Sequence, residues 1–213
     1  MNGASIMRIG IDFDNTIAGY DEVFAQVARA ENLIDPSLSG LTKRRVRDLV
    51  RIRDDGENDW IRLQSLVYGR HMHAASLLRG FESFIHRCRR CDAEVYVVSH
   101  KTEFGRLDPE RVNLRQAAMQ WMHAKGFFSG EGLGLAPDHV YFEETRLRKI
   151  ERIAALECTH FIDDLEEVLS EPSFPAFTRR ILLADRTTEP SGGPFEAFRT
   201  WHEIEKAIFE ADA

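Results

Sequence analysis

The stretch Ile9–Asp21 reads IGIDFDNTIAGYD and places two acids, Asp12 and Asp14, directly after a short apolar run. A run of this length is typical of a strand that is buried on both faces of a parallel sheet. A single aspartate at a strand end often caps the following turn, so one acid alone would indicate little. Two acids at this position favour a binding site, because ligands of open α/β sheets bind beyond the carboxyl ends of the strands.

Short apolar segments of the same kind recur along the 213 residues, and segments with helical periodicity separate them. Strands that alternate with helices predict a three-layer, Rossmann-like α/β fold with a mostly parallel sheet. The predicted strands are 7–13 (MRIGIDF), 93–99 (AEVYVVS), 139–142 (HVYF), 159–163 (THFID) and 180–185 (RILLAD).

Three segments after residue 100 have apolar residues at helical spacing. The pair Asp108-Pro109 predicts the start of the first helix, which Gly126 can close. Leu147 to Ala154 marks the second helix, and the aromatic stripe from Phe195 to Ile208 marks the last one. The stripe is typical of core packing.

The stretch between Ala18 and about Leu78 contains no good strand and reads as helical and polar. We therefore predict a core of residues 1–17 and 79–213 and a small, mostly helical cap inserted at 18–78. An insertion after the first strand is expected to lie over the site and can act as a lid.

The composition argues against several classes of partner. A formal net charge of −7 gives no support to a nucleic acid polymer as ligand. There is no apolar run long enough to span a bilayer, so we expect no membrane partner. Three cysteines do not make a disulfide framework, and we expect a cytoplasmic, reduced protein. The oligomeric state does not follow from the sequence.

A second acid pair, Asp163 and Asp164, ends the predicted strand 159–163. Two strand ends that both deliver acids can form one oxygen-rich site. Mg²⁺ prefers a few carboxylates together with water and substrate phosphate, and it relieves the repulsion between them. Ser99 ends the strand 93–99, where a hydroxyl can hold a phosphate oxygen, and Lys149 is either a phosphate ligand or a surface lysine.

These pieces resemble the haloacid dehalogenase superfamily, in particular its phosphatases with a helical cap. The matching stretches are DFDNT (12–16), Ser99 in VYVVSH, Lys149 and FIDD (161–164), and the resemblance covers about 7–185. It implies that Asp12 is a nucleophile that becomes an aspartyl phosphate, and that Asp14 is a general acid and base.

The resemblance also implies the ligands. Mg²⁺ would be held by Asp12, by Asp14 through its backbone carbonyl and by Asp164, with Asp163 positioning the lysine or a metal-bound water. Ser99 and Lys149 would bind the phosphate. The substrate is expected to be a small phosphomonoester, either a nucleotide or a sugar phosphate. The acid at Asp14 favours phosphate chemistry, because dehalogenating members lack it.

Two alternatives stay open beside hydrolysis: a phosphotransferase or phosphomutase, and a non-catalytic phosphate-binding regulatory module on the same fold. Near the site, His100 and Lys101 either contact substrate, in which case His100 is a further phosphate ligand, or start the next structural element. The basic run at 42–53 is usually a solvated helix face. Its alternative role is to meet a second anionic group of the substrate through Lys43, Arg44, Arg45 or Arg47. The CxxC of Cys88 and Cys91 and the pair His71 and His73 are not expected to bind metal.

Overall fold

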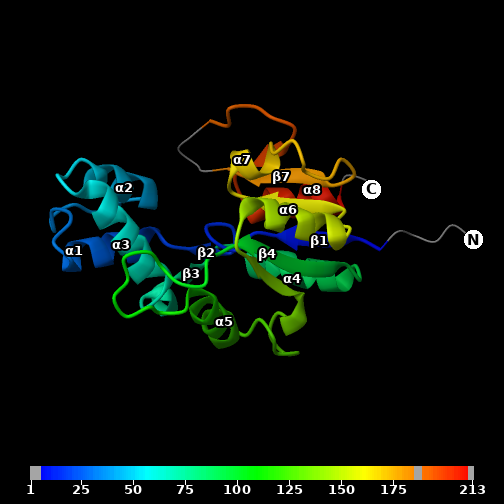
Figure 1. Cartoon of the computed structure of the whole chain (residues 1–213). Helices are drawn as coiled ribbons and strands as arrows, with labels where there is room; N and C mark the ends of the chain where they lie inside the picture. Colours follow the sequence, from blue (N-terminus) through cyan, green and yellow to red (C-terminus); the bar gives the residue numbers. More distant parts are fainter. Residues whose placement is uncertain (1–5, 185–188, 211–213) are drawn as a thin grey trace, which may run out of the picture. The chain divides into compact units, whose positions relative to one another are not determined.

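The computed structural model describes residues 6–184 and 189–210, and the chain divides into two compact units (Figure 1). The core unit comprises Met1–Ile17, Leu77–His100 and Gly126–Ala213, and the helical unit comprises Ala18–Ser76 and Lys101–Lys125. The second segment of the helical unit, 101–125, differs from the sequence-based boundaries, which counted it with the core. Its helix packs on residues about fifty positions earlier in the chain, a contact that local periodicity does not reveal.

The core unit is built on a six-stranded sheet in which all neighbouring strands are parallel, in the order β5-β4-β1-β6-β7-β8. This confirms the predicted Rossmann-like α/β class. The order places β1 at the centre, where the chain turns first toward β4 and later toward β6, and such a switch point is where ligands bind. The strands are β1 (Arg8–Ile11), β4 (Glu94–His100), β5 (Val140–Glu143), β6 (His160–Asp163), β7 (Arg179–Leu183) and β8 (Glu196–Phe198). The end of the predicted strand 180–185, Asp185, lies outside the described residues.

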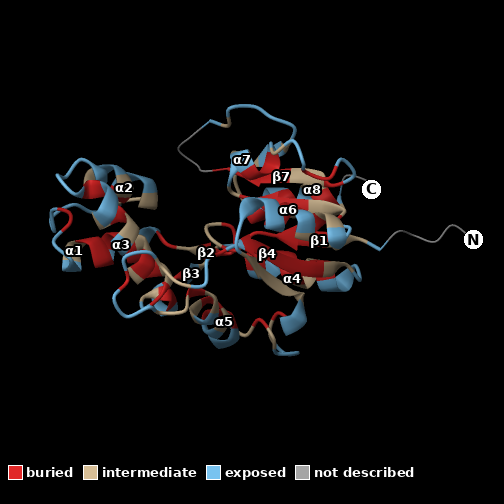
Figure 2. Cartoon of the chain, viewed as in Figure 1, coloured by how far each residue is buried: buried red, intermediate tan, exposed pale blue. Residues whose placement is uncertain are grey.

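Helices cover both faces of this sheet, and its strands are largely buried, as the red ribbon in Figure 2 shows. On one face, side chains of α6 and α7 join Phe161 and Leu182 in one apolar cluster. On the other face α4 packs against α8, with the rings of Phe84 and Trp201 4.8 Å apart. The helices of the core unit are α4 (Phe81–Arg90), η2 (Pro137–His139), α6 (Arg146–Ala155), α7 (Glu166–Leu169) and α8 (Trp201–Phe209).

Gly10 sits in β1 opposite Phe161 of β6, and the two positions are register partners. A Cβ at Gly10 would lie 2.5 Å from Cδ2 of Phe161 and 3.0 Å from Sγ of Cys158. The glycine in the opening motif is therefore a packing requirement, because only a residue without a side chain lets the Phe161 ring cover the middle of β1.

The helical unit contains helices and one short strand pair at its boundary. β2 (Ala18–Gly19) and β3 (Ser76–Leu77) form a two-stranded sheet where the chain passes between the units. The indole of Trp121 donates a hydrogen bond of 2.9 Å to the backbone oxygen of Ala75, which ties the two segments of the unit together. Its helices are α1 (Asp21–Ala30), α2 (Lys43–Arg51), α3 (Gly56–Tyr68), η1 (Met72–Ala74) and α5 (Leu114–Ala124).

Asp108-Pro109 does not start a helix, contrary to the prediction from the sequence. The Asp108 carboxylate accepts hydrogen bonds from the backbone nitrogens of Glu110 (3.1 Å) and Val112 (2.9 Å), which closes a loop. The helix begins at Leu114, where the side chain of Asn113 accepts from the nitrogen of Gln116. An aspartate before a proline can either cap the start of a helix or close a loop by accepting backbone hydrogen bonds, and Asp108 closes a loop.

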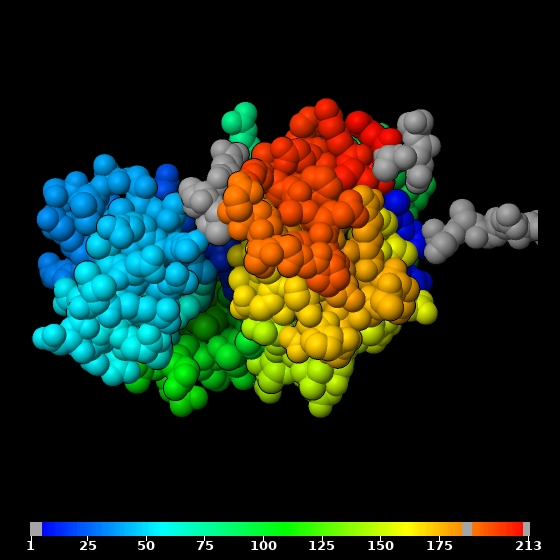
Figure 3. All heavy atoms as spheres, turned by 90° about the horizontal axis from the view of Figure 1, so that it is seen from above, coloured from blue at the N-terminus to red at the C-terminus, as the bar shows by residue number. Residues whose placement is uncertain are grey.

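The last helix is also shorter than predicted. Residues 196–198 form β8, which pairs with β7, and α8 begins at Trp201 behind a capping box of Thr200 and Glu203. Phe195 lies before β8 and Phe198 is its last residue, so their spacing of three residues matches a helical pattern only by coincidence. Figure 3 shows this C-terminal segment, in orange and red, spread beside the yellow segment of the core unit.

Within the described residues, the helices are too short or too polar to cross a membrane.

Candidate active site

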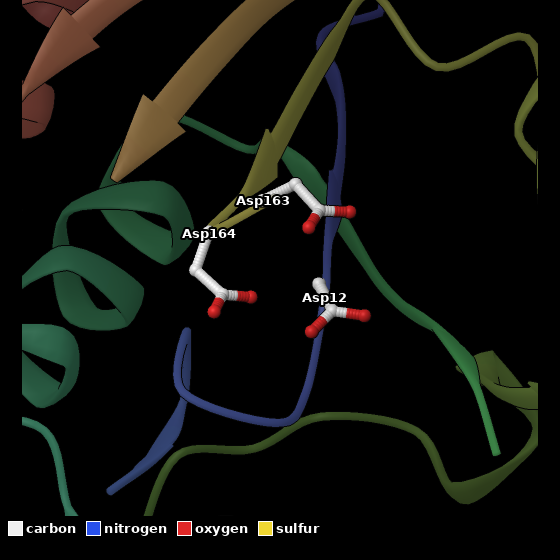
Figure 4. A group of neighbouring side chains, drawn as sticks. All are labelled: Asp12, Asp163 and Asp164. Carbon is white, nitrogen blue, oxygen red and sulfur yellow. The ribbon is translucent and has the colours of Figure 1, made fainter. Parts of the chain in front are cut away.

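Three carboxylates meet at the carboxyl end of the central strands. Asp12 follows β1, where its backbone N–H extends the ladder by donating to Ile162 O at 2.9 Å. Asp163 ends β6 and Asp164 follows it. Ligand oxygens of the three side chains lie within 4.8 Å of one another, and Figure 4 shows them gathered between the two strand ends. Asp12 of the first acid pair and both acids of the second pair thus form one cluster, because β1 and β6 are adjacent parallel strands that end at the same edge of the sheet.

Lys149 of α6 reaches into this cluster and is almost completely buried. Its Nζ lies 2.5 Å from Oδ1 of Asp12 and 2.5 Å from Oδ2 of Asp163. Of the two interpretations that the sequence left open, the structure therefore excludes a surface lysine. The ammonium links the ends of β1 and β6 and holds both carboxylates in fixed orientations.

Burial and charge oppose each other at these groups. Burial lowers the pKa of Lys149, but the charges of Asp12 and Asp163 and their hydrogen bonds outweigh it and raise this pKa overall. Burial raises the pKa of Asp163 to about 6, and the charge of Lys149 opposes that rise. The backbone N–H of Leu165 also donates to Oδ1 of Asp163, at 3.0 Å. The lysine is thus held charged, and Asp163 keeps a fixed position between two donors.

The turn after β1 is set by Asn15, whose φ is +60°. Asparagine adopts this left-handed conformation more readily than most residues, which explains why it can stand here. The turn is anchored by Trp201, whose Nε1 donates to the backbone oxygen of Thr16 at 3.0 Å, and the Thr16 hydroxyl lies 3.5 Å from Oδ1 of Asp164. Asp14 sits half-buried in the same turn, and its side chain is not one of the three clustered carboxylates.

Ser99 is buried at the carboxyl end of β4, next to β1 in the sheet. Ile11 pairs with Val97, so Ser99 is level with Phe13, one residue beyond Asp12. The register therefore places Ser99 at the same edge of the sheet as the carboxylates, and its role as a phosphate ligand stays a prediction.

His100, for which the sequence left open a role as phosphate ligand or as the start of the next element, is the last residue of β4. Its side chain is exposed, and Nε2 donates to the backbone oxygen of Glu144 at 2.9 Å, just beyond β5. Lys101 belongs to the helical unit. In the basic run, Arg44 and Arg45 are exposed and Arg47 pairs with its neighbour Asp48 at 3.1 Å.

Thr16 and Trp201 are the residues of the site that the sequence analysis did not assign. Thr16 belongs to the opening motif DFDNT, so its position in that motif could have assigned it to the site. Trp201 is separated from Thr16 by 185 residues and read only as an apolar helix position. The histidine pair and the cysteines form no metal cluster among the described residues, and all three cysteines are free.

The donor set fits a divalent cation. Three ionised carboxylates and one ammonium carry a net charge of −2, which a divalent ion would balance. Carboxylate oxygens are hard ligands of the kind that Mg²⁺ takes, usually with only one or two carboxylates and several waters. Asp12 and Asp164 come from different strands and can hold such an ion, while Asp163 is occupied by Lys149.

No model of a protein family and no curated protein matches the sequence. Solved structures do match it. A HAD family hydrolase from Deinococcus radiodurans R1, solved with phosphate and sodium, has a TM-score of 0.59 at 14% identity and covers 99% of this chain and 98% of that one. A HAD-hydrolase from Bacillus subtilis bound to magnesium gives 0.56 at 13% identity, covering 97% and 100%. A dehalogenase gives 0.57 at 11% identity, covering 97% and 98%.

The chain therefore has the fold of the haloacid dehalogenase (HAD) superfamily hydrolases, which confirms the resemblance read from the motifs. Neighbours solved with phosphate and neighbours described as dehalogenases occur at similar TM-scores. The fold alone does not separate these activities, and the distinction rests on the residues of the site.

Proposed function

We propose that this protein is a Mg²⁺-dependent phosphatase that hydrolyses a small phosphomonoester through an aspartyl phosphate on Asp12. The observation that carries the proposal is the cluster of buried Asp12, Lys149 and Asp163 with half-buried Asp164 at the switch point of the sheet. The half-buried Asp14 in the adjoining turn favours phosphate over haloacid chemistry, because an alcohol leaving group needs a proton and a halide does not.

Asp12 is suited to the role of nucleophile. Lys149 binds its Oδ1 and fixes the rotation of the carboxylate, which leaves Oδ2 to attack phosphorus. As this bond forms, the bond from phosphorus to the ester oxygen breaks, and Asp14 gives its proton to the departing alkoxide. Asp14 then accepts a proton from water, the water oxygen attacks phosphorus, and Asp12 is released together with inorganic phosphate.

The remaining residues bind and orient. Ser99 at the end of β4 donates its hydroxyl to a phosphate oxygen, and Lys149 supplies a fixed positive charge beside the nucleophile. A bound Mg²⁺ would supply Lewis-acid stabilisation of the charge on the phosphoryl oxygens, with Asp12, the Asp14 backbone carbonyl and Asp164 as its protein ligands.

The first test is phosphate release from a panel of nucleotides and sugar phosphates, with and without Mg²⁺. We expect metal-dependent release that Asp12→Asn abolishes and that Asp54→Asn, at an exposed position of the helical unit, leaves unchanged. Asp14→Asn separates the two steps with p-nitrophenyl phosphate, whose leaving group needs no proton. In this variant we expect a burst of nitrophenol and accumulation of phosphorylated protein.

Release of halide from a 2-haloacid, without phosphate release from any ester, would replace this proposal by dehalogenation. Transfer of the phosphoryl group to an added alcohol in preference to water would indicate a phosphotransferase.

A further inference from the structure

Trp201 connects the last helix of the core unit to the turn after β1. It is the first residue of α8 and directly follows Thr200, which forms a capping box with Glu203. Its indole is buried against the rings of Phe81 and Phe84 in α4, at centroid distances of 5.1 Å and 4.8 Å. The capped helix start and the two rings hold the indole in one orientation, so its N–H points in a fixed direction.

This N–H satisfies a backbone group of the turn. Nε1 of Trp201 donates to the backbone oxygen of Thr16 at 3.0 Å, and both residues are buried. The turn itself is closed by the N–H of Ile17, which donates to the backbone oxygen of Phe13 at 3.0 Å. A buried carbonyl without a donor is costly, so the indole stabilises this turn and with it the position of Thr16.

The side chain of Thr16 connects the same turn to a carboxylate of the acid cluster. Its hydroxyl lies 3.5 Å from Oδ1 of Asp164, which is the long limit of a hydrogen bond. The carboxylate of Asp164 points toward Asp12 (Figure 4), and ligand oxygens of these two residues and of Asp163 lie within 4.8 Å of one another. Trp201 thus reaches the acid cluster through a single intervening residue.

The two carboxylates proposed as metal ligands are therefore held from opposite faces of the sheet. Lys149 of α6 binds Asp12 from the face that α6 and α7 cover. Trp201 reaches Asp164 through Thr16 from the other face, which α4 and α8 cover. An ion bound by both carboxylates needs them in a fixed arrangement, and loss of an outer partner that orients a ligand typically lowers metal affinity about 10–100-fold.

We propose that Trp201 is a positioning residue of the metal site, which sets the affinity for Mg²⁺ by fixing Asp164 through Thr16. Trp201 touches neither the ion nor the substrate, so its effect is on metal binding and not on the chemical step once the ion is bound. This inference rests on the Mg²⁺ site of the proposed function and extends that site to α8.

The helical unit offers a matched control in Trp121. Its Nε1 also donates to a backbone oxygen, that of the buried Ala75 at 2.9 Å. Trp121→Phe and Trp201→Phe each keep an aromatic ring and remove one indole hydrogen bond, so both should lower the thermal unfolding temperature to a similar extent. Thr16→Val tests the link to Asp164, because it removes the hydroxyl and keeps the backbone oxygen that accepts from the indole.

Calorimetric titration with Mg²⁺ measures the affinity without turnover. We expect Trp201→Phe and Thr16→Val each to raise the Kd for Mg²⁺ about tenfold. The double variant should raise it no more than the larger single change, because both substitutions act on Asp164 along one path. Trp121→Phe should leave the Kd unchanged. Equal affinities in Trp201→Phe and Trp121→Phe would overturn the positioning role.

Turnover of p-nitrophenyl phosphate separates metal binding from the chemical step. In Trp201→Phe, the Mg²⁺ concentration that gives half of the maximal rate should rise about tenfold, while kcat at saturating Mg²⁺ should equal that of the wild type. A lower kcat at saturating Mg²⁺, together with an unchanged Kd for the ion, would show that Trp201 has only a structural role.

A spectroscopic measurement tests the same link in the wild type, so it holds even if Trp201→Phe does not fold. The chain has three tryptophans and therefore three indole N–H signals in a ¹H–¹⁵N spectrum, which Trp60→Phe and Trp121→Phe assign. Titration with Mg²⁺ should shift the signal of Trp201 and leave those of Trp60 and Trp121, both in the helical unit, unchanged.

The outcomes separate this inference from the proposed function. A shift of the Trp201 signal with Mg²⁺, without phosphate release from any ester, would retain the positioning role and overturn the phosphatase. Metal-dependent phosphate release with no shift of this signal, and with an unchanged Kd in Trp201→Phe, would overturn the positioning role alone. A wild type that binds no Mg²⁺ would overturn both.

Discussion

Replacing Lys149 by methionine removes the ammonium that separates two buried carboxylates, and the cost can be worked from the structure. Asp12 and Asp163 each lose a partner at 2.5 Å. Two ionised carboxylates whose oxygens lie within 4.8 Å of each other then repel by about 3 kcal/mol or more at an effective dielectric constant of about 20. Removing one partner of a buried ion pair typically costs about 3–5 kcal/mol, so both estimates agree.

Urea unfolding at pH 8 in the presence of EDTA measures this cost. The pH is chosen because burial raises the pKa of Asp163 to about 6 in the presence of Lys149, so that Asp163 is ionised in the folded wild type. We expect Lys149→Met to lose about 3–5 kcal/mol of unfolding free energy. The exposed Lys125→Met should change it by less than about 0.5 kcal/mol.

Addition of Mg²⁺ provides an internal check on the cause. Lys149→Met removes one positive charge, so the net charge of the cluster is more negative by one than in the wild type. Mg²⁺, which binds only the folded state, should therefore stabilise the variant more than the wild type. A loss no larger than that of Lys125→Met, or a loss that Mg²⁺ does not reduce, would refute the electrostatic account of the cluster.

Three further predictions concern the frame of the site. Gly10→Ala should destabilise the protein by about 1–3 kcal/mol in thermal unfolding, because its Cβ would overlap Phe161, and adding Phe161→Leu should recover part of the loss. Asn15→Val should cost about 1–2 kcal/mol at a φ of +60°, whereas Asn15→Gly should be tolerated; equal losses would argue against backbone strain. Burial, assisted by the charge of Arg179, lowers the pKa of His160 to about 4. Between pH 6.5 and 4 this histidine is therefore neutral in the folded protein and protonated in the unfolded chain. Its contribution to stability is present above pH 6.5 and is lost as the pH falls toward 4, by about 1–2 kcal/mol between pH 7 and 5 after allowance for solvent screening. Urea unfolding should show a smaller pH dependence over this range in His160→Gln.

The parts of the site that local patterns encode were predictable. Asp12, Asp163 and Asp164 each stand at the end of an apolar strand or directly after it, and adjacent parallel strands bring such positions together. The burial of Lys149 was not predictable from the sequence, because its helix contains several other cationic residues (RLRKIERIAA). Only the packing of α6 shows which of them faces inward. The same limit applies to Trp201, whose bond to Thr16 joins opposite ends of the chain.

Local signals also failed where one residue type serves two structures. Asp108 before a proline suits a helix start and a closed loop equally, and the choice depends on which backbone nitrogens lie within reach. Strand β8 was not predicted, because three residues are too few to show an alternation with a period of two. Its pairing with β7, which the sequence does not indicate, defines it as a strand.

The two-segment make-up of the helical unit has a consequence for synthesis and for shortening the chain. Residues 18–76 are synthesised before Trp121, whose indole donates a hydrogen bond to the backbone oxygen of Ala75. About fifty further residues must therefore be added before the partner helix of the first segment exists. During that interval the apolar surface that will meet α5 is uncovered, while β4 of the core is already being made. Removal of residues 18–76 alone would leave α5 without the segment it packs on and would expose the buried Trp121. A shortened chain that keeps only the core must therefore be cut twice, and 101–125 must go together with the segment on which it folds.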